Sequence, residues 1–299
     1  MLRILVTGSN GLLGQKLSKV IQSSNDAYLI ATGRKLSAIQ IDRGEFHLLD
    51  ITRKSEFENA ISLTRPDVII NTAALTMVDE CEKNRDVCWE ANVSSVQNLA
   101  SLCEKHQVHL VHLSTDFVFD GSHGPLDEEA VPSPVNFYGE SKLEGESIIQ
   151  KMKAEWCIIR TVLVYGITED MSRSNIVLWV KKSLEDKKAI RVVNDQFRTP
   201  TLAEDLAMGC FLAATKKAKG IFHISGNELM TPYELAVRTA EFFELDKSLI
   251  HPTDSASLQQ PAQRPAKTGF LIGKAQRELG FQPRTFHEGL ALLRGQMKP

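Results

Sequence analysis

A glycine-rich turn between a strand and a helix constrains the fold of this chain more than any other feature. Thr7–Gly14 follows the apolar segment Leu2–Val6 and opens an amphipathic stretch, which predicts a helix over Leu12–Gln22. Its glycines permit a sharp turn, close approach of the backbone to a pyrophosphate and tight packing of helix on strand. The helix start offers free N–H groups and the positive end of a dipole. We therefore expect a dinucleotide site formed by Gly8, Asn10, Gly11, Leu12, Leu13 and Gly14.

Short apolar segments alternate with amphipathic stretches through the first half of the chain. Strands are predicted at Leu2–Val6, Tyr28–Thr32, Phe46–Leu49, Val68–Asn71, His109–Leu113 and Trp156–Thr161. Helices are predicted at Leu12–Gln22, Lys54–Ser62, Val87–His106 and Ser141–Lys153. Strands rich in Val, Ile and Leu with little polar alternation are typical of a parallel sheet covered by helices on both faces. The sequence thus predicts an α/β fold with a doubly wound parallel (Rossmann) sheet.

This alternation becomes less regular after about residue 165. Helices are predicted at Ile176–Glu185, Leu202–Ala214 and Thr231–Glu244, strands at Ile190–Val193 and Gly220–Ile224, and a loop at Pro252–Pro265. We expect residues 1–165 and 201–224 to form the NAD(P)-binding domain. Residues 166–200 and 225–299 would form a smaller C-terminal α/β domain that binds substrate.

Composition and charge narrow the functional classes. The chain has 299 residues and a formal net charge of −2, which gives no electrostatic argument for nucleic acid or an anionic membrane as a partner. No apolar run is long enough for a membrane span, and the sequence starts directly with a strand, so we expect a cytoplasmic protein. Five cysteines without a C-x-x-C spacing favour buried, reduced thiols over a metal site or a disulfide framework.

The end of the second predicted strand bears on the choice of cofactor. A site that prefers NAD usually carries an acidic residue there, whereas this chain has Arg34 and Lys35. Two cations would suit a 2′-phosphate, so NADP (NADPH) is favoured and NAD is the second option. The alternative is that both are solvated loop charges. Asp50, after the third strand, could accept a hydrogen bond from the adenine amino group, or it could cap the helix that follows Ile51.

Tyr138 and Lys142 are four residues apart in a segment that we expect to lie on a helix, and therefore on one face of it. A phenol is a poor acid at neutral pH, and a nearby ammonium lowers its pKa. The hydroxyl-bearing segment Ser114-Thr115 lies upstream and could hold an oxygen that gains or loses a proton. Together with a dinucleotide, these residues could move a proton while a hydride moves at the adjacent carbon.

The motifs resemble those of the extended short-chain dehydrogenase/reductases, and most closely the dTDP-4-dehydrorhamnose reductase family. The matching segments are Thr7–Gly14, Asn71–Ala74 with Thr76 and Val78-Asp79, Asn92, Ser114–Gly121, Tyr138–Lys142 with Gly145-Glu146, Arg160 with Val164–Gly166, Asp195-Gln196 with Pro200-Thr201, and Arg264-Pro265. This resemblance covers nearly the whole chain. It implies reduction of the 4-keto group of a nucleotide-activated deoxysugar by NADPH or NADH.

The resemblance also implies roles for individual residues. Tyr138 would donate a proton to the C4 oxygen, and Lys142 would lower the pKa of Tyr138 and bind the nicotinamide ribose. Thr115, with Ser114 as the second candidate, would bind the reacting oxygen. On the cofactor side it implies Arg34, Lys35, Asp50, Ile51, Ala73, Ala74 and Asn92, with Asn71 on the same loop. On the substrate side it implies Thr76, Asp116, Phe119, Leu163, Gln196, Arg198 and Arg264. A guanidinium suits a diphosphate, although each arginine could equally form a surface salt bridge.

The chain departs from the family at two positions. Phe117 stands where the family usually has tyrosine, which we expect to change packing rather than chemistry. Leu163 stands where many of these reductases have a tryptophan that lies against the sugar, so the resemblance leaves the identity of the sugar open.

Three functions follow as hypotheses. The first is an NADPH-dependent reductase of a dTDP-4-keto-6-deoxyhexose, most simply of dTDP-4-dehydrorhamnose to dTDP-rhamnose. The second is a nucleotide-sugar epimerase or dehydratase, but a dehydratase needs an acidic pair beside Thr115, and Phe117 follows Asp116. The third is a non-catalytic, NADP-binding regulatory subunit, like the animal relative that regulates methionine adenosyltransferase. We expect a monomer or homodimer and assign no metal ligand.

Overall fold

A computed structural model describes residues 1–169 and 175–297 of the chain. Within these residues seven parallel strands form one sheet, in the spatial order β10-β6-β5-β4-β1-β2-β3. In chain order they are β1 (Leu2–Thr7), β2 (Ala27–Gly33), β3 (Gly44–Leu48), β4 (Val68–Asn71), β5 (His109–Thr115), β6 (Trp156–Thr161) and β10 (Gly220–His223). The strand order reverses direction at β1, and a doubly wound sheet binds its ligand at such a point. The predicted α/β class with a doubly wound parallel sheet is confirmed.

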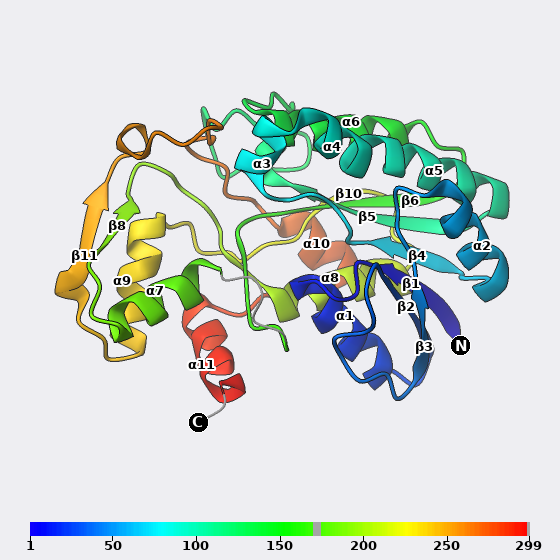
Figure 1. The fold of residues 1–299 in the computed structure, drawn as a ribbon, viewed down its shortest axis with the longest axis horizontal. Coiled ribbons are helices and arrows are strands. Elements are labelled where there is room, and N and C mark those ends of the chain that lie inside the picture. The colour runs from blue at the N-terminus through cyan, green and yellow to red at the C-terminus, as the bar shows by residue number, and fades with distance from the viewer. Residues whose placement is uncertain (170–174, 298–299) are drawn as a thin grey trace.

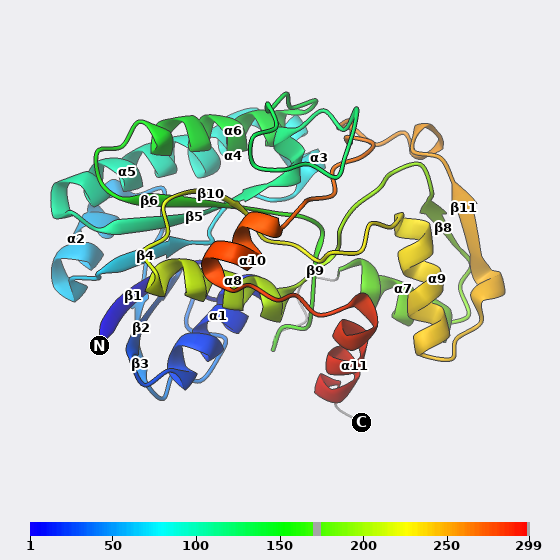
Figure 2. The same ribbon diagram turned by 180° about the vertical axis from the view of Figure 1, so that it is seen from behind.

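Helices cover both faces of the sheet (Figures 1 and 2). One layer contains α1 (Leu12–Ser23), α8 (Ala203–Thr215) and α10 (Gly273–Leu279). The other contains α2 (Lys54–Thr64), α3 (Val78–Lys83), α4 (Arg85–Trp89), α5 (Ser95–His106) and α6 (Phe137–Gln150). Each layer buries its own hydrophobic cluster against the central strands, with Ile4 and Val6 facing one layer and Leu5 facing the other. This burial on both faces explains why the strands lack polar alternation.

A smaller lobe lies beyond the carboxyl ends of the strands (Figures 1 and 2). It contains α7 (Ile176–Glu185), α9 (Pro232–Phe242) and α11 (Phe286–Gln296), together with the parallel pair β8 (Ile190–Val193) and β11 (Ile250–Thr253). A further parallel pair, β7 (Val164–Tyr165) and β9 (Thr201–Leu202), joins the two parts of the chain. The predicted division into two domains stays a prediction. The seven sheet strands all fall within the segments that it assigns to the NAD(P)-binding domain.

Three secondary-structure predictions need correction. The predicted helix Val87–His106 is in fact α4 and α5, joined by a π-helical turn over Glu90–Ser94. The helix predicted from Ser141 begins earlier, at Phe137, because Asn136 accepts a hydrogen bond from the N–H of Gly139 at 2.9 Å and caps it. The predicted loop Pro252–Pro265 begins inside β11 and holds a short 3₁₀ turn. Helices α3, α10 and α11 were not predicted.

Candidate active site

The glycine turn has the shape that a pyrophosphate requires. Gly8 has φ +67°, in the left-handed region that favours glycine. A Cβ atom on Gly8 would lie 3.1 Å from the Cα of Ala73, and one on Gly14 only 2.3 Å from the carbonyl oxygen of Gly8. Helix α1 starts after Gly11 with no acidic residue in its first turn, so its N–H groups are available to an anion. These residues fit the phosphates of a nicotinamide dinucleotide.

The second loop of the cofactor side is tied to this turn through Asn10. Its Nδ2 donates to the carbonyl oxygens of Lys35 at 3.2 Å and Leu36 at 2.9 Å, and its Oδ1 accepts from the N–H of Ala38 at 2.9 Å. The side chains of Arg34 and Lys35 are exposed beside this turn. Asn10 therefore holds the backbone that carries both cations, while Leu12 and Leu13 lie half-buried at the start of α1.

Asp50 shapes the turn before α2. Its Oδ1 accepts from the N–H of Thr52 at 3.0 Å and from the Thr52 hydroxyl at 2.9 Å. Burial raises the pKa of Asp50, but these hydrogen bonds and the charges of Arg34 and Arg53 outweigh it and hold the pKa below its usual value. The cap residue of α2 itself is Arg53, so Asp50 caps the turn through Ile51 and not the helix. The contact with adenine stays a prediction.

Tyr138 and Thr115 meet because helix α6 packs closely on the turn that follows β5. A Cβ atom on Gly139 would lie 2.1 Å from the carbonyl oxygen of Phe117, so only glycine allows this approach. Tyr138, Lys142 and Thr115 are 7, 3 and 6 % exposed. The Phe117 ring packs edge-on against the Tyr138 ring, with centroids 5.7 Å apart, which is consistent with a packing role for the residue that replaces tyrosine.

The electrostatics of the pair differ from the expectation that Lys142 lowers the pKa of Tyr138. Burial raises the pKa of Tyr138, and a hydrogen bond with Thr115 opposes this rise without cancelling it. Burial also lowers the pKa of Lys142 to about 8, against the favourable charge of Glu146. The net direction for the phenol is upward because desolvation of a phenolate outweighs the other influences. Tyr138 is therefore held in its neutral, proton-donating form.

Lys142 is anchored on the side of β5. Its Nζ donates to the carbonyl oxygen of Leu113 at 2.6 Å and lies 3.2 Å from Nε2 of His112. His112 is 1 % exposed and was not singled out from the sequence. The sequence does give a reason to consider His112, because an imidazole in a strand that is buried on both faces needs a polar partner.

Asn92 lies in the π-helical turn and is completely buried. Its Oδ1 accepts from the N–H of Leu75 at 2.9 Å, while its Nδ2 donates to the carbonyl oxygen of Leu75 at 3.0 Å and to Ser141 Oγ at 3.0 Å. The amide thus fixes the loop after β4 to helix α6. This loop carries Ala73 and Ala74, which are half-buried, and Thr76, which is exposed.

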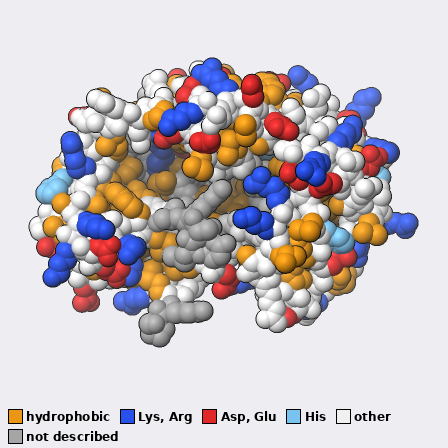
Figure 3. Space-filling model, in the orientation of Figure 1, with side chains coloured by type: hydrophobic (Ala, Val, Ile, Leu, Met, Phe, Trp, Pro, Cys, Tyr) orange, Lys and Arg blue, Asp and Glu red, His pale blue; other side chains and the backbone are white. Residues whose placement is uncertain are grey.

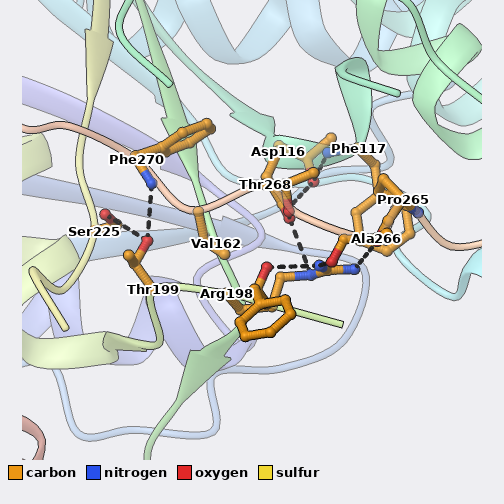
Figure 4. A network of polar contacts seen from close by, with 12 residues as sticks. Asp116, Phe117, Val162, Arg198, Thr199, Ser225, Pro265, Ala266, Thr268 and Phe270 are labelled. Atoms are coloured by element: carbon orange, nitrogen blue, oxygen red, sulfur yellow. Dashed lines mark hydrogen bonds and ion pairs between the residues drawn. The ribbon is translucent and has the colours of Figure 1, made fainter. Parts of the chain in front are cut away.

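The predicted substrate residues Asp116 and Arg198 lie together in a buried network between the two lobes (Figure 4). Nε of Arg198 lies 3.4 Å from a carboxylate oxygen of Asp116, which also accepts a hydrogen bond from Thr268. Arg198 Nη2 donates to the carbonyl oxygen of Pro265 at 2.6 Å. Burial raises the pKa of Asp116 and lowers that of Arg198, in each case against the charge of the other. Both side chains are therefore engaged within the protein.

Arg264 forms a second contact of this kind. Its guanidinium makes a bidentate pair with Asp79 on α3, at 2.7 and 2.8 Å. The neighbouring Asn136, which caps α6, donates to the carbonyl oxygen of Gln263 at 2.7 Å. The segment around Arg264 is thereby attached to the helices that carry the catalytic candidates.

The remaining substrate-side predictions lie in different surroundings. Gln196 is 8 % exposed at the start of the segment that leads to Arg198. Leu163 is half-buried and has φ +36°, an uncommon conformation for leucine. Phe119 is 2 % exposed and packs against Phe270 with ring centroids 6.1 Å apart, so its ring belongs to the core, and its contact with substrate stays a prediction. In the space-filling view the molecule is hollowed between its lobes, with hydrophobic side chains beside the hollow (Figure 3).

Across residues 1–169 and 175–297, no group of three or more His, Cys, Asp or Glu side chains could hold a metal ion. None of the helices in the same ranges has both the length and the apolar character for a membrane span.

A family model described as the RmlD substrate binding domain matches residues 2–298. The chain therefore belongs to the RmlD substrate binding domain family. A mouse relative, methionine adenosyltransferase 2 subunit beta, is 33% identical over 295 residues, covering 96% of this chain and 86% of its own length. A probable low-salt glycan biosynthesis reductase of Haloferax volcanii is 30% identical over 290 residues, with 96% of each chain covered.

A crystal structure of the dTDP-4-dehydrorhamnose reductase of Bacillus anthracis in complex with NADP is also similar. It has a TM-score of 0.85 and 27% identity, and the match covers 99% of this chain and 100% of that one. The predicted resemblance to the reductase family is confirmed. The prediction of an NADP-dependent oxidoreductase agrees with the Haloferax reductase and with the NADP complex of the Bacillus enzyme.

Proposed function

We propose that this chain reduces the 4-keto group of a nucleotide-activated deoxysugar with NADPH, and that its substrate is dTDP-4-dehydrorhamnose, which it converts to dTDP-rhamnose. The observation that carries the proposal is the buried set of Thr115, Tyr138 and Lys142 at the carboxyl edge of the sheet. The glycine turn opens at the same edge. Proton donor and cofactor cradle therefore share one edge.

The residues of this chain would donate the proton and hold the reacting oxygen. NADPH, when bound, supplies a hydride to C4 of the sugar. Tyr138, which burial keeps protonated, donates its proton to the C4 oxygen as negative charge develops there. Thr115 holds the same oxygen, and its hydrogen bond with Tyr138 fixes the direction of the phenol. The ammonium of Lys142, one helical turn away, would stabilise the phenolate that remains.

The predicted cofactor residues would divide the work between backbone and side chains. Gly8, Gly11 and Gly14 would approach the pyrophosphate, with Ala73 on the facing loop. Arg34 and Lys35, exposed and held by Asn10, would bind the 2′-phosphate that distinguishes NADP from NAD. Asn92 would act indirectly, by holding the backbone of Leu75.

A second candidate function is that of a non-catalytic regulatory subunit. It rests on the mouse relative, whose name is that of a subunit of methionine adenosyltransferase. The complete set of Thr115, Tyr138 and Lys142 favours an enzyme over a regulatory subunit. An epimerase or dehydratase is less favoured, because Asp116 is already engaged by Arg198 and Thr268 and is followed by Phe117.

The test is NADPH oxidation by the purified chain with a panel of nucleotide 4-ketosugars, and NADH in parallel. We expect turnover with dTDP-4-dehydrorhamnose and a lower KM for NADPH than for NADH. Absence of turnover with every ketosugar, combined with co-purification of a second subunit, would replace the reductase by the regulatory function. Tightly bound NAD that is not consumed would favour epimerase or dehydratase chemistry.

A further inference from the structure

A line of buried polar side chains runs from the end of β1 to Lys142. Thr7 Oγ1 lies 2.6 Å from Asn71 Oδ1, and Asn71 Nδ2 lies 3.0 Å from Nδ1 of His112. His112 Nε2 then lies 3.2 Å from Lys142 Nζ. All four residues are at most 3 % exposed. The line therefore links the end of β1, where the glycine turn begins, to the catalytic lysine through three neighbouring strands.

The imidazole at the centre of this line carries one proton. Burial, and then the charge of Lys142, hold the pKa of His112 well below its usual value, so the ring stays neutral. A neutral imidazole donates from one nitrogen and accepts at the other. Because both nitrogens of His112 face a partner, the nitrogen that carries the proton decides the direction of every hydrogen bond in the line.

Two arrangements of the line follow from these donor and acceptor rules, and in both Thr7 Oγ1 also accepts from the N–H of Ala73 at 3.2 Å. With a charged lysine, Nζ donates to His112 Nε2, Nδ1–H donates to the Asn71 oxygen, and the amide N–H donates to Thr7. With an uncharged lysine, Thr7 donates to the Asn71 oxygen, the amide donates to Nδ1, and Nε2–H donates to Nζ. The amide in the structure is oriented as in the second arrangement. Half a turn about its Cβ–Cγ bond gives the first with nearly the same heavy-atom positions.

We propose that His112 is a positioning residue for Lys142, and that the hydrogen bonds from Thr7 to His112 reverse direction when the lysine loses its proton. In this reversal Lys142 releases one proton to solvent, while His112 keeps one proton and carries it on Nε2 instead of Nδ1. The role in turnover rests on the proposed reductase function, but the reversal itself does not.

The other groups that face the lysine come from three helices. Glu146 on α6 favours its charged form, against burial, and the thiols of Cys88 on α4 and Cys81 on α3 lie nearby. Tyr138 lies one turn before it on α6. Glu146 is itself paired with Arg160 at 2.7 Å, and Cys88 accepts from Asn92 at 3.4 Å. None of these partners is substituted in the variants used below, so the effect of a substitution at His112 can be compared with wild type directly.

The direct test follows the His112 ring by ¹⁵N NMR in the purified chain without substrate, from about pH 6 to about pH 10, on either side of the Lys142 pKa of about 8. We expect the proton to move from Nδ1 to Nε2 as pH rises. In Lys142→Met we expect one tautomer throughout. The same wild-type tautomer at both extremes would overturn the proposal, as would a reversal that persists in Lys142→Met.

The kinetic test compares two amides at position 112. The Gln side chain of His112→Gln can place an oxygen where Nε2 accepts from Lys142, whereas that of His112→Asn reaches only the Nδ1 position. We expect His112→Asn to lower turnover about tenfold. The alkaline limb of its pH–rate profile should lie at a pH about 1 unit lower than in wild type. His112→Gln should keep the wild-type limb. Identical profiles for the two variants, with equal thermal stability, would show that His112 only fills space.

The two tests separate failure of this inference from failure of the proposed function. If no ketosugar is turned over, the NMR result still decides whether the hydrogen bonds reverse. If turnover is normal and the tautomer never changes, the reductase function stands and the role of His112 falls.

Discussion

The cofactor side and the substrate side of the site are built by different kinds of contact. On the cofactor side the decisive atoms belong to the backbone: the turn closes because Gly14 lies against Gly8, six residues earlier in the sequence. On the substrate side they belong to charged and polar side chains from distant segments. Asp116 and Thr268 are 152 residues apart, and Arg264 and Asp79 are 185 apart. The cofactor side is thus fixed by local geometry, and the substrate side by the fold as a whole.

The two sides should therefore respond differently to substitution. A change at Gly14 should weaken the binding of the dinucleotide and destabilise the turn itself, because the atoms nearest to a Cβ atom there belong to Gly8 and Ser9. A change in Asp116 should disturb the packing of one lobe on the other, because its partners Arg198 and Thr268 belong to segments outside the sheet. Four substitutions test the contrast, beginning with the proton donor that lies where the two sides meet.

The largest effect is expected from Tyr138→Phe. It removes the phenolic proton and leaves the ring that packs against Phe117. We expect turnover to fall by about a thousandfold, at the upper range of general acid catalysis, with NADPH affinity nearly unchanged. Turnover with the ketosugar and fluorescence titration of NADPH measure the two quantities. Turnover within a factor of a few of wild type would refute the assignment of Tyr138 as the acid.

Asp116→Asn tests the buried pair between the lobes. The substitution leaves Arg198, which is 4 % exposed, without its compensating charge. We expect the free energy of unfolding to fall by about 3 kcal/mol, measured by urea denaturation. The control is Asp186→Asn, which weakens pairs with the exposed Lys182 and Lys188 and should cost less than about 1 kcal/mol. Equal losses in the two variants would mean that the buried pair does not hold the lobes together.

Gly14→Ala tests the local construction of the cofactor side. The new Cβ atom would lie 2.3 Å from the Gly8 carbonyl oxygen, so the turn must open. We expect NADPH binding to weaken about tenfold, and stability to fall by about 2 kcal/mol. Gly295→Ala is the matched control, since its Cβ atom would meet nothing within 4 Å on helix α11. Unchanged NADPH binding in Gly14→Ala would show that the turn does not carry the dinucleotide.

The same contrast decides what could be predicted from sequence. The strands Val68–Asn71, Trp156–Thr161 and Ile190–Val193 were predicted with the bounds that the structure has, because an apolar run ends where burial ends. The predicted start of α6, Ser141, is too late, because the side chain of Asn136 accepts from the N–H of Gly139 and begins the helix at Phe137. The π-helical turn at Asn92 depends on its hydrogen bonds to Leu75, and helical periodicity does not reveal those.

The partners of the arginines could not be predicted for the same reason. Nothing within the neighbourhood of Arg198 in the sequence identifies Asp116 as its partner, since the pairing follows from the packing of one lobe on the other. The sequence favoured a diphosphate or a surface salt bridge for each arginine. Arg198 lies in neither setting, because it is buried in an internal ion pair.

The smallest effect is expected from Arg264, and it distinguishes a substrate ligand from a link between segments. Its pair with Asp79 is partly exposed, so Arg264→Ala should cost only about 1 kcal/mol of stability. If the guanidinium also binds a diphosphate, Arg264→Ala should raise KM for the nucleotide sugar about tenfold.

Asp79→Asn is the matched variant for Arg264, because it weakens the same pair and leaves the guanidinium in place. We expect its KM to change by less than about threefold, well below the effect of losing an ionic contact with substrate. Steady-state kinetics at saturating NADPH measure both variants. An equal rise in KM for the two would assign Arg264 to the attachment of its segment to α3. In that case both arginines would serve the fold, and the diphosphate would have to be bound by other groups between the lobes.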